Sequence, residues 1–224
     1  MAVSFKTLTQ NDKTTSRTLL HEAIPITGSL LAGTYDTSSD GRELNVKTFS
    51  HGMFQSVYDY PYTSSSANHI FDITFGFKED PIFDGLLEGS ELQNGAVTTQ
   101  TNKKKNIYSQ MAQILAGYNI NGNTREFDLD GNFSGGAKIG AATFLTFSRL
   151  LVKDEIKKGS FAITFGTAAS HADPFTSEVT LADVEATSSI KINSPAGEYG
   201  LLYTGSSDDP GDPRGLIFYQ AGIA

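Results

Sequence analysis

The sequence of 224 residues contains no cysteine, which excludes disulfide bridges and metal sites built on thiolates. A chain without cysteine fits synthesis in a reducing cytosol. Basic residues are also few, 17 against 25 acidic ones, and the formal net charge is −8. Because a protein that coats nucleic acid needs a basic surface to replace counterions, we expect no general nucleic-acid binding.

Long apolar runs are missing as well. No stretch approaches the roughly 18 apolar residues that a membrane-spanning helix needs, so we expect no membrane association. Residues 1–17 are polar and do not resemble a secretion signal. Motifs that cradle phosphates, a G-x-S-x-G turn and a histidine pair at zinc-site spacing are also absent. We therefore expect a protein that is not an enzyme and that uses no cofactor and no metal.

The most regular feature is a pair of segments, 71–76 and 161–166, that both read F-x-I-T-F-G. Runs of β-branched and aromatic residues that stop at a glycine are typical of strands packed on at least one face. Because the flanking residues barely match, we interpret the pair as two strands of one sheet rather than as a duplicated half. The 22 glycines and the many serines, threonines and asparagines suit short strands joined by tight turns.

These patterns predict a mainly β, β-rich α+β fold, with antiparallel sheets or a sandwich, in one domain over 1–224. One amphipathic helix is expected around residues 103–116, with Asn102 capping its start and Gly117 its end. Its apolar side chains recur at helical spacing. The positions expected to pack the helix are Met111, Ile114 and Leu115.

Residues 128–132 (DLDGN) begin like a calcium-binding loop. An EF-hand requires glycine at the sixth position of the loop and glutamate at the twelfth. Those positions hold Phe133 and Ile139, so an EF-hand is excluded. We interpret the segment as an aspartate-rich turn.

A first candidate interface is the tyrosine cluster of Tyr58, Tyr60 and Tyr62. Tyrosines among small polar residues serve protein contacts and carbohydrate platforms. They are equally common in sheet cores that keep the hydroxyl at the rim, and the sequence does not decide between the two. A second candidate is the run Lys103, Lys104 and Lys105, placed by our prediction at the start of the helix. It is a solvated face or a docking site for an acidic surface, including that of a partner subunit.

The third candidate interface is the end of the chain, residues 215–224, which reads as an apolar strand. Leu216, Phe218 and Tyr219 belong to it, and no charged residue follows them. An uncovered strand edge of this kind invites pairing or aggregation. We expect it to be covered either by a continuation of the chain or by a neighbouring subunit.

Several of these segments together resemble a family of virion structural proteins from contractile-tailed marine bacteriophages, including cyanophage-like ones. Residues 15–28 (TSRTLLHEAIPITG) are similar to the start of that family, and residues 50–62 (SHGMFQSVYDYPY) are similar to another of its segments. Residues 153–159 (KDEIKKG) and both F-x-I-T-F-G strands belong to the similarity. Residues 215–224 resemble an internal segment, so we expect the chain to be the N-terminal part of a longer one.

The resemblance implies a non-enzymatic structural component of the tail, baseplate or neck, located in the virion and made in the host cytoplasm. Its partners would be other virion proteins, and it would form a homo-oligomer. The family offers no catalytic residues. The alternative is a receptor- or glycan-binding module at the tail tip, with Tyr58, Tyr60 and Tyr62 as its stacking platform.

Overall fold

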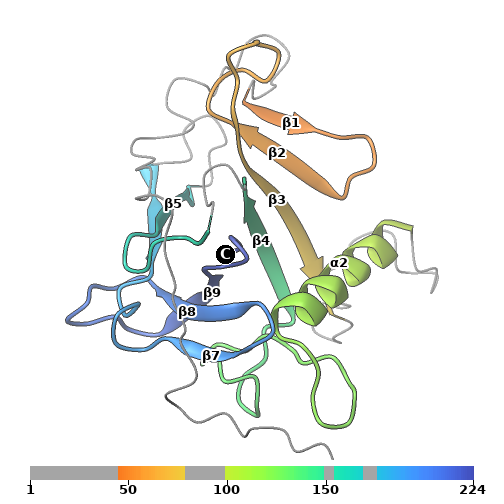
Figure 1. Cartoon of the computed structure of the whole chain (residues 1–224). Coiled ribbons are helices and arrows are strands. Elements are labelled where there is room, and N and C mark those ends of the chain that lie inside the picture. The colour runs from red at the N-terminus through yellow and green to blue at the C-terminus, as the bar shows by residue number, and fades with distance from the viewer. Residues whose placement is uncertain (1–44, 79–98, 149–153, 169–175) are drawn as a thin grey trace, which may run out of the picture.

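The structure of the protein is a computed structural model, and it describes residues 45–78, 99–148, 154–168 and 176–224 (Figure 1). Residues 15–28, which carry part of the family resemblance, lie outside these ranges. Nine strands and one helix are described. In chain order they are β1 (Val46–Thr48), β2 (Phe54–Tyr58), β3 (His69–Phe77), α2 (Thr99–Leu115), β4 (Ala141–Phe147), β5 (Ala162–Gly166), β6 (Glu178–Ala182), β7 (Lys191–Ser194), β8 (Gly197–Tyr203) and β9 (Pro213–Phe218).

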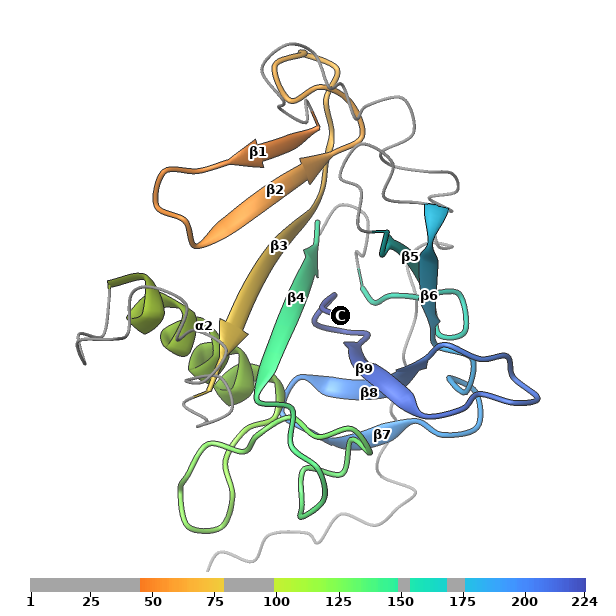
Figure 2. The same ribbon diagram turned by 180° about the vertical axis from the view of Figure 1, so that it is seen from behind.

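The strands form two antiparallel sheets. The first has the order β1-β2-β3-β4, and the second has the order β5-β6-β8-β7, with β9 also paired to β8. Figure 2 shows α2 beside the end of β3, and the C-terminus between β4 and β9. The prediction of a β-rich α+β fold with antiparallel sheets is confirmed.

The two F-x-I-T-F-G segments lie in different sheets. Residues 71–76 belong to β3, an inner strand that pairs with both β2 and β4. Residues 162–166 form β5, which pairs with β6 at the end of the second sheet. The interpretation as two strands of one sheet was therefore wrong. Strand composition reports burial and says little about which strand lies next to it.

The helix α2 buries a face slightly rotated from the predicted one. Ile107, Tyr108, Ala112 and Leu115 are buried in the main core, whereas Ile114 is 59% exposed. The buried positions recur about once per helical turn, so they lie on one face of α2. Met111 and Leu115 were predicted correctly, and the placement of Ile114 in the core was wrong.

Of the two predictions for the ends of α2, one is correct and one is wrong. The helix begins at Thr99, so Asn102 lies inside it and does not cap it. Gly117 does follow the last turn, as predicted. It takes a left-handed φ of 78° and donates its amide to the carbonyl of Ala112 at 2.9 Å, which satisfies a carbonyl of the last turn.

The main core is built around stacked aromatic rings that join the two halves of the chain. Tyr199 stacks between Phe133 and Phe218, with ring centroids 5.1 and 5.2 Å apart and both interplanar angles 18°. Phe127 meets Phe133 and Phe218 edge-on, with interplanar angles of 69° and 68°. Burial raises the pKa of the Tyr199 hydroxyl, which donates a hydrogen bond to the carbonyl of Gly131 at 2.5 Å.

Gly76 allows α2 to lie directly on β3. A Cβ atom at this position would lie 2.7 Å from the backbone nitrogen of Tyr108 and 3.1 Å from a methyl carbon of Ile107. A helix backbone cannot move aside as the end of a flexible side chain can. The close approach of helix and sheet therefore depends on the missing side chain.

We predict that Gly76→Ala lowers the free energy of unfolding by about 1–3 kcal/mol, the usual cost of overpacking a core. Gly215→Ala is the matched control, because its Cβ would meet Leu202 at 3.4 Å, an ordinary contact. We expect the control to change stability by less than about 0.5 kcal/mol. Urea denaturation of the three proteins measures both effects, and equal stability of the two variants would contradict this account of the helix packing.

Asp183 is a buried carboxylate that organises the connector before β5. Its two oxygens accept hydrogen bonds from the amides of Gly159 at 2.8 Å and Phe161 at 3.0 Å. The hydroxyl of Tyr219 lies 3.3 Å from the carboxylate. Burial, the largest effect, raises the pKa of Asp183 above its ordinary value of 3.8, and these hydrogen bonds partly oppose the rise.

We predict that Asp183→Asn destabilises the protein, because an amide group offers one acceptor to the two amides that the carboxylate satisfies. The expected loss is about 1–3 kcal/mol, the cost of an unsatisfied buried donor. Since the folded-state pKa of the acid is raised, the stabilisation it contributes is present at low pH and is lost as pH rises through that pKa. The difference in the free energy of unfolding between wild type and variant should therefore narrow as pH rises above 3.8, the ordinary pKa of the acid, in urea denaturation. A gap that widened over this range would contradict the assignment.

Candidate interaction surface

The tyrosine cluster begins at Tyr58, the last residue of β2, and continues on the connection between β2 and β3, which a pair of polar side chains holds in place. The Asp59 carboxylate accepts hydrogen bonds from the backbone amide of Asn68 at 2.7 Å and from its side-chain amide at 2.8 Å. The Asp59 amide donates to the Asn68 carbonyl at 3.1 Å. The side-chain hydrogen bond from Asn68 lowers the pKa of Asp59 most. The connection is thus closed by three hydrogen bonds.

The three tyrosines of this connection differ in exposure. Tyr60 is 59% exposed and Tyr62 is 36% exposed, whereas Tyr58 is half-buried. The rings of Tyr58 and Tyr62 are 6.4 Å apart and tilted by 44°, and His69 meets Tyr58 edge-on at 5.6 Å. The structure therefore brings Tyr58 and Tyr62 together with His69, which the sequence reasoning did not include. It does not align the rings in one plane.

Beside the tyrosines, Ser56, Asp72 and His69 form a hydrogen-bonded group across β2 and β3. The Ser56 hydroxyl donates to Oδ1 of Asp72 at 2.6 Å, and Nε2 of His69 lies 2.9 Å from the same oxygen. In a serine hydrolase the histidine contacts the serine and takes its proton. Here the aspartate stands between the two. The arrangement joins neighbouring strands and does not activate the hydroxyl through the histidine.

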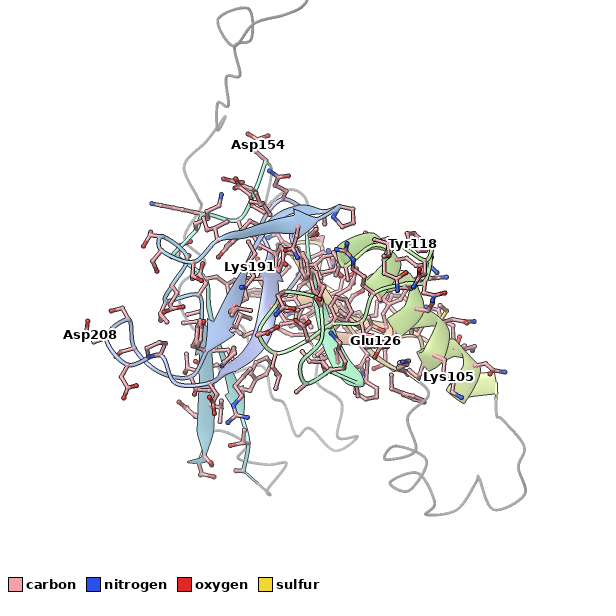
Figure 3. All side chains as sticks on the ribbon, turned by 90° about the horizontal axis from the view of Figure 1, so that it is seen from below. Lys105, Tyr118, Glu126, Asp154, Lys191 and Asp208 are labelled. Atoms are coloured by element: carbon pink, nitrogen blue, oxygen red, sulfur yellow. The ribbon has the colours of Figure 1, made fainter. Side chains whose placement is uncertain are left out.

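The lysine run lies in the second turn of α2, because the helix begins at Thr99 and not at the lysines. All three side chains are half-buried. The Lys103 ammonium donates to the carbonyl of His51 at 2.9 Å, and burial lowers the pKa of Lys104. Figure 3 shows Lys105 on the flank formed by α2, on the opposite side of the molecule from the acidic loop that carries Asp208. Lys103 thus anchors the helix to the loop before β2.

Lys104 lies at a shallow groove between α2 and the first sheet. The groove has a volume of about 290 Å³. Phe54 and Phe75, 37% and 38% exposed, contribute apolar surface to it. Next to it, His51 stacks on Phe49 at 5.1 Å and contacts Phe54 at 4.9 Å. The sequence carries no signal for this grouping of rings, because it arises from the loop that follows β1.

The third candidate interface requires a correction. Leu216, Phe218 and Tyr219 are 8%, 2% and 0% exposed. The strand β9 is covered by β8 of the same chain, and Tyr219 is covered by the connector, whose Ile156 amide donates to the Tyr219 carbonyl at 2.9 Å. These three side chains are buried in the two core clusters of the described structure. The prediction of a strand is correct for residues 215–218, which belong to β9, whereas residues 219–222 form a turn. The cover of the strand comes from within the chain.

The aspartates of the aspartate-rich turn form contacts with neighbouring residues of the same chain. Asp128 is fully buried and pairs through Oδ2 with the Lys138 ammonium at 3.0 Å, while Oδ1 has no hydrogen-bond partner among the described residues. Asp130 accepts the amide of Asn132 at 3.1 Å, and that hydrogen bond is the main cause of its lowered pKa. Within the described ranges, no group of three or more histidine or acidic residues could hold a metal ion.

Compared with known proteins, the chain matches no family model, no curated protein and no solved structure. In the part of the chain that the structure describes, no helix is long and apolar enough to cross a membrane.

Proposed function

We propose that the protein is a non-enzymatic structural component of a tailed phage particle, in the tail, baseplate or neck. It would act by burying surface against other virion proteins and copies of itself. The family resemblance of residues 50–62 carries this proposal, because that segment forms β2 and the tyrosine connection that follows. The exposed rings of Tyr60 and Tyr62 therefore belong to the segment that resembles virion proteins.

The geometry of the connection supports a role in protein contacts. Tyrosines bury a large area at a low cost in side-chain entropy, because each has only two rotatable side-chain bonds. The clamp between Asp59 and Asn68 holds the backbone that carries them. A surface that is already ordered loses less conformational entropy on binding.

We predict that mass spectrometry of purified, gradient-banded particles detects this protein at a stoichiometry comparable to that of other tail or neck components. Lysate from uninfected cells, processed in the same way, is the control. Absence from particles at a depth where minor tail proteins are detected would contradict the proposal.

A second candidate function is glycan or receptor binding at the tail tip. Tyr60 favours it, because a tyrosine ring with 59% of its surface exposed offers a face on which a sugar can stack. Tyr58 and Tyr62 form an adjoining pair. The tilt between those two rings makes any such platform curved.

We predict for this second candidate that a glycan array finds at least one specific ligand, and that Tyr60→Ala or Tyr62→Ala weakens its binding about two- to tenfold, the value of one aromatic contact. Tyr118→Ala is the matched control, because Tyr118 is 54% exposed and lies beyond the end of α2. Binding unchanged in all three variants would contradict the platform. A blank array would leave the structural role as the better account.

A further inference from the structure

The acidic loop, residues 204–212 between β8 and β9, carries three carboxylates that are not paired with a cation. Asp208, Asp209 and Asp212 are all exposed. None of them forms an ion pair with any residue that the structure describes. Because three negative charges on one short loop repel one another, a cationic partner would stabilise the loop.

Hydrogen bonds across the acidic loop hold its tip in one conformation. The amide of Gly205 donates to the carbonyl of Pro210 at 3.2 Å, and the amide of Ser206 donates to the carbonyl of Asp209 at 3.1 Å. Asp208 lies at the tip of this turn, which Figure 3 shows projecting from the molecule on the side opposite to α2. A loop that is already ordered loses little conformational entropy on binding.

The groove beside α2 has the opposite charge. Of the described residues that line it, only Lys104 is charged. The Lys104 side chain is half-buried and forms neither a hydrogen bond nor an ion pair with a described residue. Partial removal of an ammonium from water without a partner costs free energy, and burial accordingly lowers the pKa of Lys104. A carboxylate beside Lys104 would offset that cost.

Two further lysines lie next to the groove. The Lys47 ammonium lies 5.0 Å from the centroid of the Phe49 ring, and this ring stacks on His51. The carbonyl of His51 accepts a hydrogen bond from Lys103, and the ring of His51 contacts Phe54 in the groove. Basic side chains thus border the groove in a chain whose net charge is −8. The chemistry of the groove therefore fits an acidic segment.

We propose that the acidic loop of one copy docks in the groove of a second copy, with the carboxylates of Asp208 and Asp209 at the Lys104 ammonium. The chain carries both complementary surfaces, each without a partner of its own among the described residues. The groove volume of about 290 Å³ lies just below the range of about 300–1,000 Å³ for small-molecule pockets, and it suits the tip of a loop. The exposed faces of Phe54 and Phe75 make the surroundings partly apolar, which strengthens a hydrogen bond between charged groups.

The placement of the two surfaces makes this contact head-to-tail. The acidic loop and α2 lie on opposite sides of the molecule (Figure 3), so two rigid copies cannot insert both loops into both grooves at once. Each pair keeps one free loop and one free groove. Repetition of the contact gives a ring if the rotation closes and a filament if it does not. The use of such a ring or filament in a particle rests on the proposed function, whereas the contact itself does not.

The test is sedimentation velocity of the full chain at about 10 to 300 µM, the range suited to a weak contact of small area. Salt at about 0.15 M limits the repulsion between copies to about 8 Å. We expect the wild type to form species larger than a dimer. Lys104→Ala and the double variant Asp208→Asn/Asp209→Asn should each raise the dissociation constant at least about tenfold, the value of one charge-assisted hydrogen bond. Lys157→Ala and Glu178→Gln are the matched controls, because they remove exposed charges elsewhere and should associate like the wild type.

A mixture of the two defective proteins tests the direction of the contact. Lys104→Ala keeps an intact acidic loop, and the double aspartate variant keeps an intact groove. An equimolar mixture should therefore form dimers and nothing larger, although each protein alone is monomeric at the same concentration. Thermal denaturation of each variant shows that it is folded.

Four results would overturn the proposal. A wild-type chain that stays monomeric would assign the groove to an acidic segment of a different molecule. Association that both variants leave unchanged would place the contact elsewhere on the surface. A mixture that stays monomeric would show that loop and groove do not meet, and a mixture that forms larger species would exclude the head-to-tail arrangement. Detection of the protein in particles is a separate measurement, so this contact and the proposed function can fail independently.

Discussion

The backbone hydrogen bonds of the last residues hold the two sheets of this protein together. Residues 222–224 pair with β4 on one side and with Phe218 at the end of β9 on the other. The strand β9 in turn pairs with β8, so this short segment connects one sheet to the other. The aromatic stack on Phe218 and the buried Ile217 and Tyr219 lie at the same junction. This pairing adds backbone hydrogen bonds to the side-chain packing of the main core, which also joins the two sheets.

Buried polar groups around the junction position the loops that close it. Asp183 binds the amides that lead into β5 and lies beside the hydroxyl of Tyr219. On the other side of the core, the Asp128–Lys138 pair fixes the turn that carries Phe133, a residue with a left-handed φ of 58°. Removing one partner of such a contact leaves the other group buried without a hydrogen bond. Each contact therefore fixes the conformation of its loop. Residue types that suggest catalysis or metal binding in the sequence thus have structural roles here.

The surface offers different chemistry on its separate flanks. The tyrosine connection presents rings held by a closed hydrogen-bonded loop. The flank of α2 carries the lysine run, one member of which is used to hold the His51 loop. The loop that bears Asp208 projects on the opposite side (Figure 3). A structural component of the kind proposed needs distinct surfaces of this kind.

The sequence by itself determined the secondary structure class, the helix and its end at Gly117, because turn chemistry, strand composition and helical periodicity are local properties. It also indicated an apolar strand in residues 215–224, of which the structure confirms residues 215–218 as part of β9. Only the tertiary structure decided which strands are neighbours, why Ile114 faces solvent while Tyr108 is buried, and that Leu216, Phe218 and Tyr219 are covered by the chain itself. The interaction between Asp183 and the amides of Gly159 and Phe161 could not be predicted either. These outcomes depend on contacts between residues far apart in the chain, and a pattern of local spacing carries no information about which distant segment supplies the partner.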